Sequence, residues 1–129
     1  MTLLNLIGLV VADMPRSLAF YRDLGLDLPP EADDAPHTEV TLPGGLRVAW
    51  DTVDVIRSFD PAWQAPTGGH RVSLAFRCDS PTEVDTTYRR MVDAGHTGHL
   101  PPWDAFWGQR YAVLVDPDGT AVDLFADQP

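Results

Sequence analysis

The sequence lacks several features that would assign it to a common class of protein. It has one cysteine, Cys78, so no internal disulfide can form and the chain does not depend on an oxidising compartment. No segment approaches the roughly 18–20 uninterrupted apolar residues of a membrane span, and the longest apolar run, Leu6 to Ala12, has the length of a buried strand. The N-terminus lacks the basic and long apolar regions of a secretory signal. We therefore expect a cytoplasmic protein that is not attached to a membrane.

Positive charge is also scarce, with 9 Lys and Arg residues against 19 Asp and Glu residues and a formal net charge of -10. Nucleic-acid binding needs a basic stripe to neutralise phosphates, so this class of partner is excluded. An acidic surface keeps a protein soluble, and it would also attract a cationic small ligand. No Gly-x-Ser-x-Gly elbow or phosphate-cradling loop is present. Cys78 ends an apolar strand, which favours a buried thiol over a nucleophile.

The two halves of the chain show the same order of predicted elements. The first half reads as a strand at 3–10, a helix capped by Asp13 and ended by Gly25, and then three strands. Two of those strands, at about 37–42 and 46–51, are joined by Pro43-Gly44-Gly45, a hairpin signal.

The second half begins with a strand at 71–78 and a helix that Asp79-Ser80-Pro81 opens and Gly95 ends. Strands at about 109–115 and 120–126 follow, separated by the tight turn Asp116-Pro117-Asp118-Gly119. Both halves therefore fit one βαβββ unit, repeated after about 66–74 residues.

Such a duplication predicts an α+β fold in which two βαβββ repeats form a cup-shaped mixed sheet with helices outside. We expect a single domain over 1–129, with repeat one at 1–59, a linker at 60–69 and repeat two at 70–129. Strand alternation assigns one row of each strand to the helices and the other row to the cup. The predicted cup rows are Arg47, Ala49 and Asp51; Arg71, Ser73 and Ala75; and Ala121, Asp123 and Phe125.

The segment Asn5 to Tyr21 resembles the opening strand and helix of the glyoxalase / bleomycin-resistance / extradiol-dioxygenase group, the vicinal oxygen chelate superfamily. The resemblance spans nearly the whole chain, and it is most specific at Asp13 to Gly25 and at Trp107 to Tyr111 leading to Asp116 to Gly119. The resemblance implies that the metal ligands of the superfamily's metalloenzymes correspond to four positions in this sequence, Leu6, Ala49, Ser73 and Asp123. Only the carboxylate of Asp123 is a good ligand, whereas a catalytic cation needs about three. We therefore expect no metal and no cofactor.

The four histidines do not lie at the transferred positions. His96 and His99 form an H-x-x-H pair, but they follow the helix-ending Gly95 and are expected on a loop. We interpret them, with His37 and His70, as ordinary surface or loop residues, although an unexpected metal site would have to use them.

Aromatic residues are concentrated before and within the strand at 109–115, and Trp103 and Trp107 are expected on a Pro- and Gly-containing loop. Aromatic planes can hold a flat ring system and attract cations. The run Trp107-Gly108-Gln109-Arg110 resembles the signature of bleomycin-resistance proteins, which implies a metal-free homodimer, with repeats paired or swapped between chains, that sequesters an aromatic antibiotic or metabolite, neutral or cationic. The predicted stacking residues are Trp103, Trp107, Tyr111 and Trp63, and the residues predicted to orient polar groups are Asp123, Arg47, Glu39, Ser73 and His37.

An enzyme is the alternative. Asp123 could act as a general base, alone or with His37 or Glu39, in a metal-independent isomerase, cyclase or hydrolase. A glyoxalase-like lyase or a dioxygenase relative acting in the same cup stays open as well. A ligand-sensing or accessory domain is a third possibility, for which the sequence carries no partner-binding signal.

Overall fold

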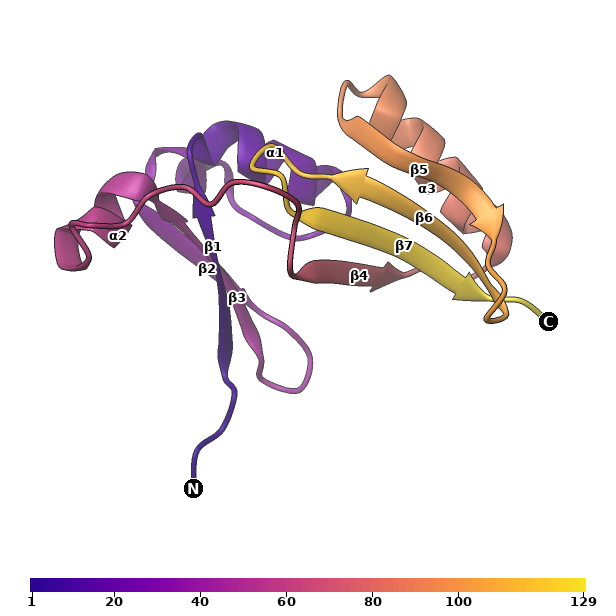
Figure 1. Cartoon of the computed structure of the whole chain (residues 1–129), viewed down its shortest axis with the longest axis horizontal. Coiled ribbons are helices and arrows are strands. Elements are labelled where there is room, and N and C mark those ends of the chain that lie inside the picture. The colour runs from indigo at the N-terminus through magenta and orange to yellow at the C-terminus, as the bar shows by residue number, and fades with distance from the viewer. The chain divides into compact units, whose positions relative to one another are not determined.

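The computed structural model describes all 129 residues, which fold into two compact units, Met1–Thr67 and Gly68–Pro129 (Figure 1). The boundary falls inside the predicted linker at 60–69. Both units combine helices with a sheet, and the predicted α+β class is confirmed. No helix combines the length and the apolar character that crossing a bilayer requires.

The first unit is a three-stranded sheet with helices. Its elements are β1 (Leu6–Val11), α1 (Met14–Asp23), the 3-10 helix η1 (Pro30–Asp34), β2 (His37–Thr41), β3 (Arg47–Thr52) and α2 (Val53–Phe59). The strand order is β1-β3-β2, with β3 parallel to β1 and antiparallel to β2 (Figure 1).

Local sequence signals explain where α1 begins and ends. The Asp13 side chain accepts a hydrogen bond from the backbone N–H of Arg16 (3.1 Å), as predicted for its N-cap. Gly25 has φ +106°, a conformation that closes the helix and strains any residue with a Cβ. Tyr21 of α1 then packs edge-on against Trp50 of β3, with ring centroids 5.3 Å apart, and both rings are fully buried.

The prediction of three strands after the first helix is wrong for the first unit, which has two. Where a third strand would precede β2, the chain forms η1, and after β3 it forms α2. Pro29, Pro30 and Pro36 lack the N–H groups that a strand donates, and aspartate is a poor strand former. Thr52 begins α2 by accepting a hydrogen bond from the N–H of Val55 (3.4 Å).

The second unit has the predicted βαβββ order. Its elements are β4 (Ser73–Arg77), α3 (Pro81–Asp93), β5 (Thr97–Asp104), β6 (Gln109–Val115) and β7 (Ala121–Asp127). The sheet order is β4-β7-β6-β5, with β4 parallel to β7 and the other pairs antiparallel (Figure 1). Ser80 caps α3 by accepting from the N–H of Glu83 (3.2 Å).

Each sheet packs one face on its helix, and we call the opposite face its far face. In the first sheet, Trp50 lies on the helix side, so alternation places Arg47, Ala49 and Asp51 on the far face. In the second sheet, Arg110 bonds Asp85 of α3, which marks the helix side of β6. The strand pairings then place the predicted cup residues of β4 and β7 on the far face of that sheet.

Candidate functional site

The four positions at which the family resemblance implies metal ligands occur on the far faces of the two sheets. In the first sheet, Leu6 is paired across from Arg47, and Ala49 is fully buried. In the second, Ser73 lies exposed at the start of the edge strand β4, while Asp123 is 9% exposed on β7. An alkyl chain, a methyl group and a neutral hydroxyl cannot complete the coordination that one carboxylate begins.

Asp123 is also engaged with another side chain. The Tyr111 hydroxyl donates a hydrogen bond of 2.5 Å to its Oδ2. Burial, and then this bond to a carboxylate, raise the pKa of Tyr111 to about 12, so the phenol keeps its proton at neutral pH. No group of three or more His, Cys, Asp or Glu side chains is arranged to hold a metal ion. The residues present therefore do not fit the family's metal.

An aromatic cluster covers one end of the far face of the second sheet. Trp103 of β5 is paired with Tyr111 of β6, and their ring centroids are 5.5 Å apart. Trp107, in the turn between these strands, lies 6.1 Å from Trp103 and 5.2 Å from Tyr111, in edge-to-face contacts. Phe106 contacts Trp107 at 5.1 Å, and Phe125 stacks on Tyr111 at 6.4 Å. We call these five residues the aromatic cluster.

The structure corrects the expected location of Trp103. It lies on β5, and only Trp107 is in the turn. The residues Pro101 and Pro102 suggested a loop, but β5 is the edge strand of its sheet, where proline is tolerated. Its pairing with β6 also shifts register between Leu100 and Trp103, which accommodates the two prolines.

Hydrogen bonds fix the orientation of the exposed tryptophan in the cluster. The Trp107 Nε1–H donates to Gln109 Oε1 (2.8 Å), and Gln109 Nε2 donates to Asp127 Oδ1 (3.0 Å). Arg110, the last residue of the Trp-Gly-Gln-Arg motif, points to the helix side instead and pairs with Asp85 (2.9 Å) and Asp104 (3.1 Å). The motif thus has one half that presents an aromatic surface and one half that ties β6 to α3.

Trp63 belongs to the first unit, whereas the other predicted stacking residues belong to the second. Arg57 of α2 lies over its ring at 5.8 Å and donates a hydrogen bond to its backbone oxygen (3.3 Å). The ring therefore already has a cationic partner. A ligand that stacks on Trp63 would have to share or replace this contact.

A second group of predicted residues forms a polar network on the far face of the first sheet. His37 Nδ1 lies 2.5 Å from Asp51 Oδ1, and its Nε2 lies 3.1 Å from Glu39 Oε2. Arg47 donates to Glu39 (3.0 Å) and to Asn5 (2.8 and 3.2 Å). The hydrogen bond to Asp51 is the main cause that raises the pKa of His37, and bonds to Arg47 and then His37 lower the pKa of Glu39.

The structure thus joins His37, Glu39 and Arg47, while Asn5 was not anticipated from the sequence. Its part could have been suspected because Asn5 immediately precedes β1, at the edge that faces Arg47. Of the remaining histidines, His96 lies on the turn after α3 as expected, but His99 lies within β5 and not on a loop.

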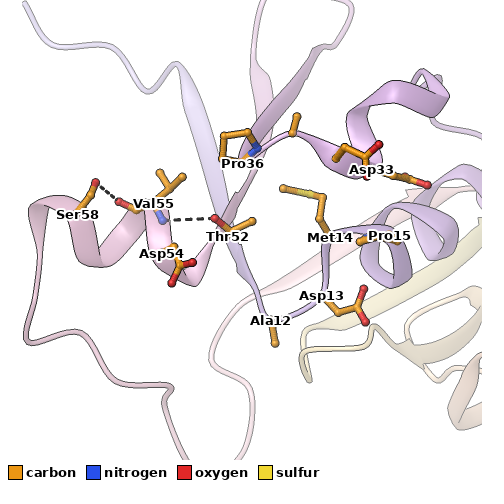
Figure 2. Close-up of a pocket in the computed structure, with 12 residues that line it drawn as sticks. Ala12, Asp13, Met14, Pro15, Asp33, Pro36, Thr52, Asp54, Val55 and Ser58 are labelled. Carbon is orange, nitrogen blue, oxygen red and sulfur yellow. Dashed lines mark hydrogen bonds between the residues drawn. The ribbon is translucent and has the colours of Figure 1, made fainter.

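A hollow of about 680 Å³ in the first unit lies away from these networks. It opens where β1 leads into α1 and β3 leads into α2 (Figure 2). Its lining consists of Ala12, Asp13, Met14, Pro15, Asp33, Asp34, Ala35, Pro36, Thr52, Asp54, Val55 and Ser58. None of the predicted ligand residues lines it.

Comparisons with solved structures agree with this fold. A glyoxalase/bleomycin resistance protein/dioxygenase from Nocardioides is 27% identical, with a TM-score of 0.74 over 99% of this chain and 85% of that one. A glyoxalase/bleomycin resistance protein/dioxygenase family enzyme from Burkholderia phytofirmans PsJN has a TM-score of 0.81 at 19% identity, over 96% and 98% of the two chains. A glyoxalase-related enzyme from Fulvimarina pelagi has a TM-score of 0.78 at 21% identity, over 98% and 89%.

A search of curated protein sequences finds no match. Residues 3–124 match the sequence family described as the Glyoxalase/Bleomycin resistance protein/Dioxygenase superfamily, which is most of the chain. The order of strands and helices in the second unit and the likeness to the solved structures agree with that match. The chain belongs to the glyoxalase/bleomycin resistance protein/dioxygenase superfamily.

Proposed function

We propose that this protein binds a small aromatic molecule, neutral or cationic, without metal and sequesters it from its target, in the manner of bleomycin-resistance proteins. The observation that carries the proposal is the aromatic cluster. Phe106 is 97% exposed and Trp107 is 47% exposed. Large aromatic side chains grouped on a surface mark interaction sites, and flat rings offer stacking area at little entropic cost.

Charge around the cluster favours a cation over an anion. The carboxylates of Asp123 and Asp127 are hydrogen-bonded to members or neighbours of the cluster, and the guanidinium of Arg110 lies on the other face of the sheet. The Tyr111 hydroxyl donates a hydrogen bond to an anionic acceptor, which increases electron density in the ring and strengthens its attraction for a cation. The net charge of -10 acts in the same direction over a longer range.

Tryptophan fluorescence tests this proposal directly. Bleomycin, daunorubicin and proflavine, which are aromatic cations, are titrated into the protein, and at least one should quench the emission saturably and be recovered unchanged. Trp107→Phe should weaken its binding about tenfold, because a truncated aromatic anchor typically costs more than about 1 kcal/mol. Trp63→Phe is the matched control and should bind normally. Linear, non-saturating quenching by all three compounds would refute the proposal for this class of ligand.

Self-association is part of the same proposal, because the resemblance implies a homodimer. Sedimentation velocity should give the mass of two chains at micromolar concentration. A single-chain mass throughout that range would contradict the dimer while leaving the binding measurement intact.

A metal-independent enzyme is the second candidate, and the polar network favours it. A carboxylate that holds one nitrogen of a histidine orients the ring for proton transfer, and His37 has this arrangement with Asp51. Its other nitrogen lies against Glu39, which a substrate would have to replace. Mass spectrometry of a bound compound after incubation distinguishes the two candidates. A new product that disappears in His37→Gln, with binding retained, would favour the enzyme.

A further inference from the structure

The hollow in the first unit has a position typical of ligand sites. The strands β1 and β3 are parallel neighbours, paired at their ends through Val11 and Thr52. Each strand leads directly into a helix, and the two helices leave the sheet on different paths, with the hollow between their first turns (Figure 2). Crevices at the carboxyl ends of parallel strands are a common place for small molecules. At about 680 Å³, the hollow is within the size range of ligand pockets.

Part of the lining of this hollow is apolar. The Met14 side chain, itself 4% exposed, extends between Pro36 and Thr52, and Val55 lies on the side of α2 (Figure 2). Ala12 and Ala35 add small apolar groups to the lining. These groups can contact the hydrocarbon part of a ligand but offer it no hydrogen bonds.

The charged groups of the lining are all carboxylates, and no Lys, Arg or His lines the hollow. Two of the four have partners within the protein: Asp13 accepts a hydrogen bond from the backbone N–H of Arg16 (3.1 Å), and Asp33 forms an ion pair with Arg22 (2.8 Å). The other two carboxylates, Asp34 and Asp54, have neither a hydrogen bond nor an ion pair. The helix starts also provide no free anion site, because the protein's own side chains cap them.

We propose that this hollow is a second ligand site, for a small organic cation that consists of a protonated amine on a compact aliphatic body. The hydrocarbon part contacts Met14, Pro36 and Val55, and the ammonium group is attracted by Asp34 and Asp54. This site is independent of the aromatic cluster, which lies in the other unit. A non-aromatic amine therefore distinguishes the two sites.

Three probes of the same shape separate charge from hydrophobic contact. Cyclohexylamine, cyclohexanol and cyclohexanecarboxylate are titrated into the full-length ¹⁵N-labelled protein, and amide shifts are followed. The amine should shift Val55 and Ser58 saturably, the alcohol should bind at least about tenfold more weakly, and the carboxylate should shift neither residue. Raising the salt concentration should weaken the binding of the amine but not that of the alcohol.

A pair of double variants, matched in charge, provides the control. Asp34→Asn/Asp54→Asn should reduce affinity for cyclohexylamine about tenfold, whereas Asp27→Asn/Asp93→Asn removes the same charge outside the hollow and should reduce it less than about twofold. Neither carboxylate has a hydrogen bond or an ion pair, and Asp54 loses only its interaction with the start of α2, so the first variant should unfold within a few degrees of the wild-type temperature. Equal binding of the amine and the alcohol, equal effects of the two variants, or the absence of saturable shifts would each overturn the proposal.

Discussion

Removing the Tyr111 hydroxyl should destabilise the protein, because it deprives a buried carboxylate of its hydrogen-bond donor. Asp123 is 9% exposed and accepts a hydrogen bond from the Tyr111 hydroxyl, with the two oxygens 2.5 Å apart. Hydrogen bonds to charged groups contribute about 1.5–3 kcal/mol, and a buried acceptor left unpaired costs at least as much. We therefore expect Tyr111→Phe to lower the free energy of unfolding by about 2 kcal/mol, while the ring keeps its contacts with Trp103 and Trp107.

Urea unfolding of Tyr111→Phe, Asp123→Ala and the double variant measures this coupling as a double-mutant cycle. The two single changes should add to more than the double change, with an interaction energy of about 1–2 kcal/mol. Trp107→Phe serves as a control that changes the cluster without touching this bond. An interaction energy below about 0.5 kcal/mol would refute the reasoning, because non-contacting residues give values of that size.

The hydrogen bond between Tyr111 and Asp123 should also affect stability and tyrosine titration at alkaline pH. The pKa of Tyr111 is raised to about 12 from 10.0, first by burial and then by Asp123. Folding therefore favours the protonated phenol, and this contribution to stability is complete below about pH 10 and is lost as the pH rises towards 12. Phenolate absorbance should show one tyrosine titrating near 12, and Asp123→Asn should lower that pKa while burial keeps it above 10.

Two further changes test the packing and the polar network. Gly98→Ala should destabilise the second unit by about 1–3 kcal/mol in thermal unfolding, because its Cβ would lie 2.1 Å from the Tyr88 hydroxyl oxygen; equal stability in wild-type and variant protein would show that Tyr88 moves freely. Asp51→Asn should lower the pKa of His37 towards 6.5 in an NMR titration, since Asp51 is the main cause that raises it. The stability that the charged ring supplies is present below 6.5 and is lost as the pH rises through the raised pKa, so a variant that titrates as the wild type does would contradict this assignment.

Helix boundaries could be predicted from the sequence because they depend on local chemistry. Asp13 and Ser80 cap the helices where they were expected to, and Gly25 ends α1 with a positive φ. The faces of the strands could also be predicted, since alternation is a property of the extended backbone itself. In β3, the contact of Trp50 with Tyr21 of α1 places Trp50 on the helix side and so fixes the alternation of that strand.

The number of strands and their pairing were harder to predict from the sequence, because they depend on partners that are distant along the chain. Pro30 and Pro36 argue against a third strand in the first unit. Pro101 and Pro102, in contrast, lie within β5, where the edge position and the register shift accommodate them. The same residue type therefore excludes a strand in one repeat and not in the other. The difference is the position of the strand in its sheet, which the local sequence does not state.

The polar network shows which part of a site can be anticipated from a hairpin. A turn at Pro43-Gly44-Gly45 with Leu42 opposite Leu46 fixes every pair further along, including His37 with Asp51 and Glu39 with Ala49. Once the turn is recognised in the sequence, the exact length of its loop is the one further quantity needed to predict this register. No such rule connects Tyr111 with Asp123, because they are diagonal neighbours on adjacent strands and their meeting depends on side-chain length.

The absence of a full set of metal ligands and the hydrogen bond of Asp123 to Tyr111 are consistent with each other. A lone carboxylate on a sheet face needs a partner when it is buried, and Tyr111 supplies one from the neighbouring strand. That bond also holds the ring of Tyr111 against Trp103 and Trp107. The position that would carry a metal ligand in a metalloenzyme relative therefore anchors an aromatic surface in this chain. Restoring one ligand, for example with Leu6→His, would leave Ala49 and Ser73 without donors and Asp123 engaged, so such a variant should gain no stoichiometric zinc by elemental analysis.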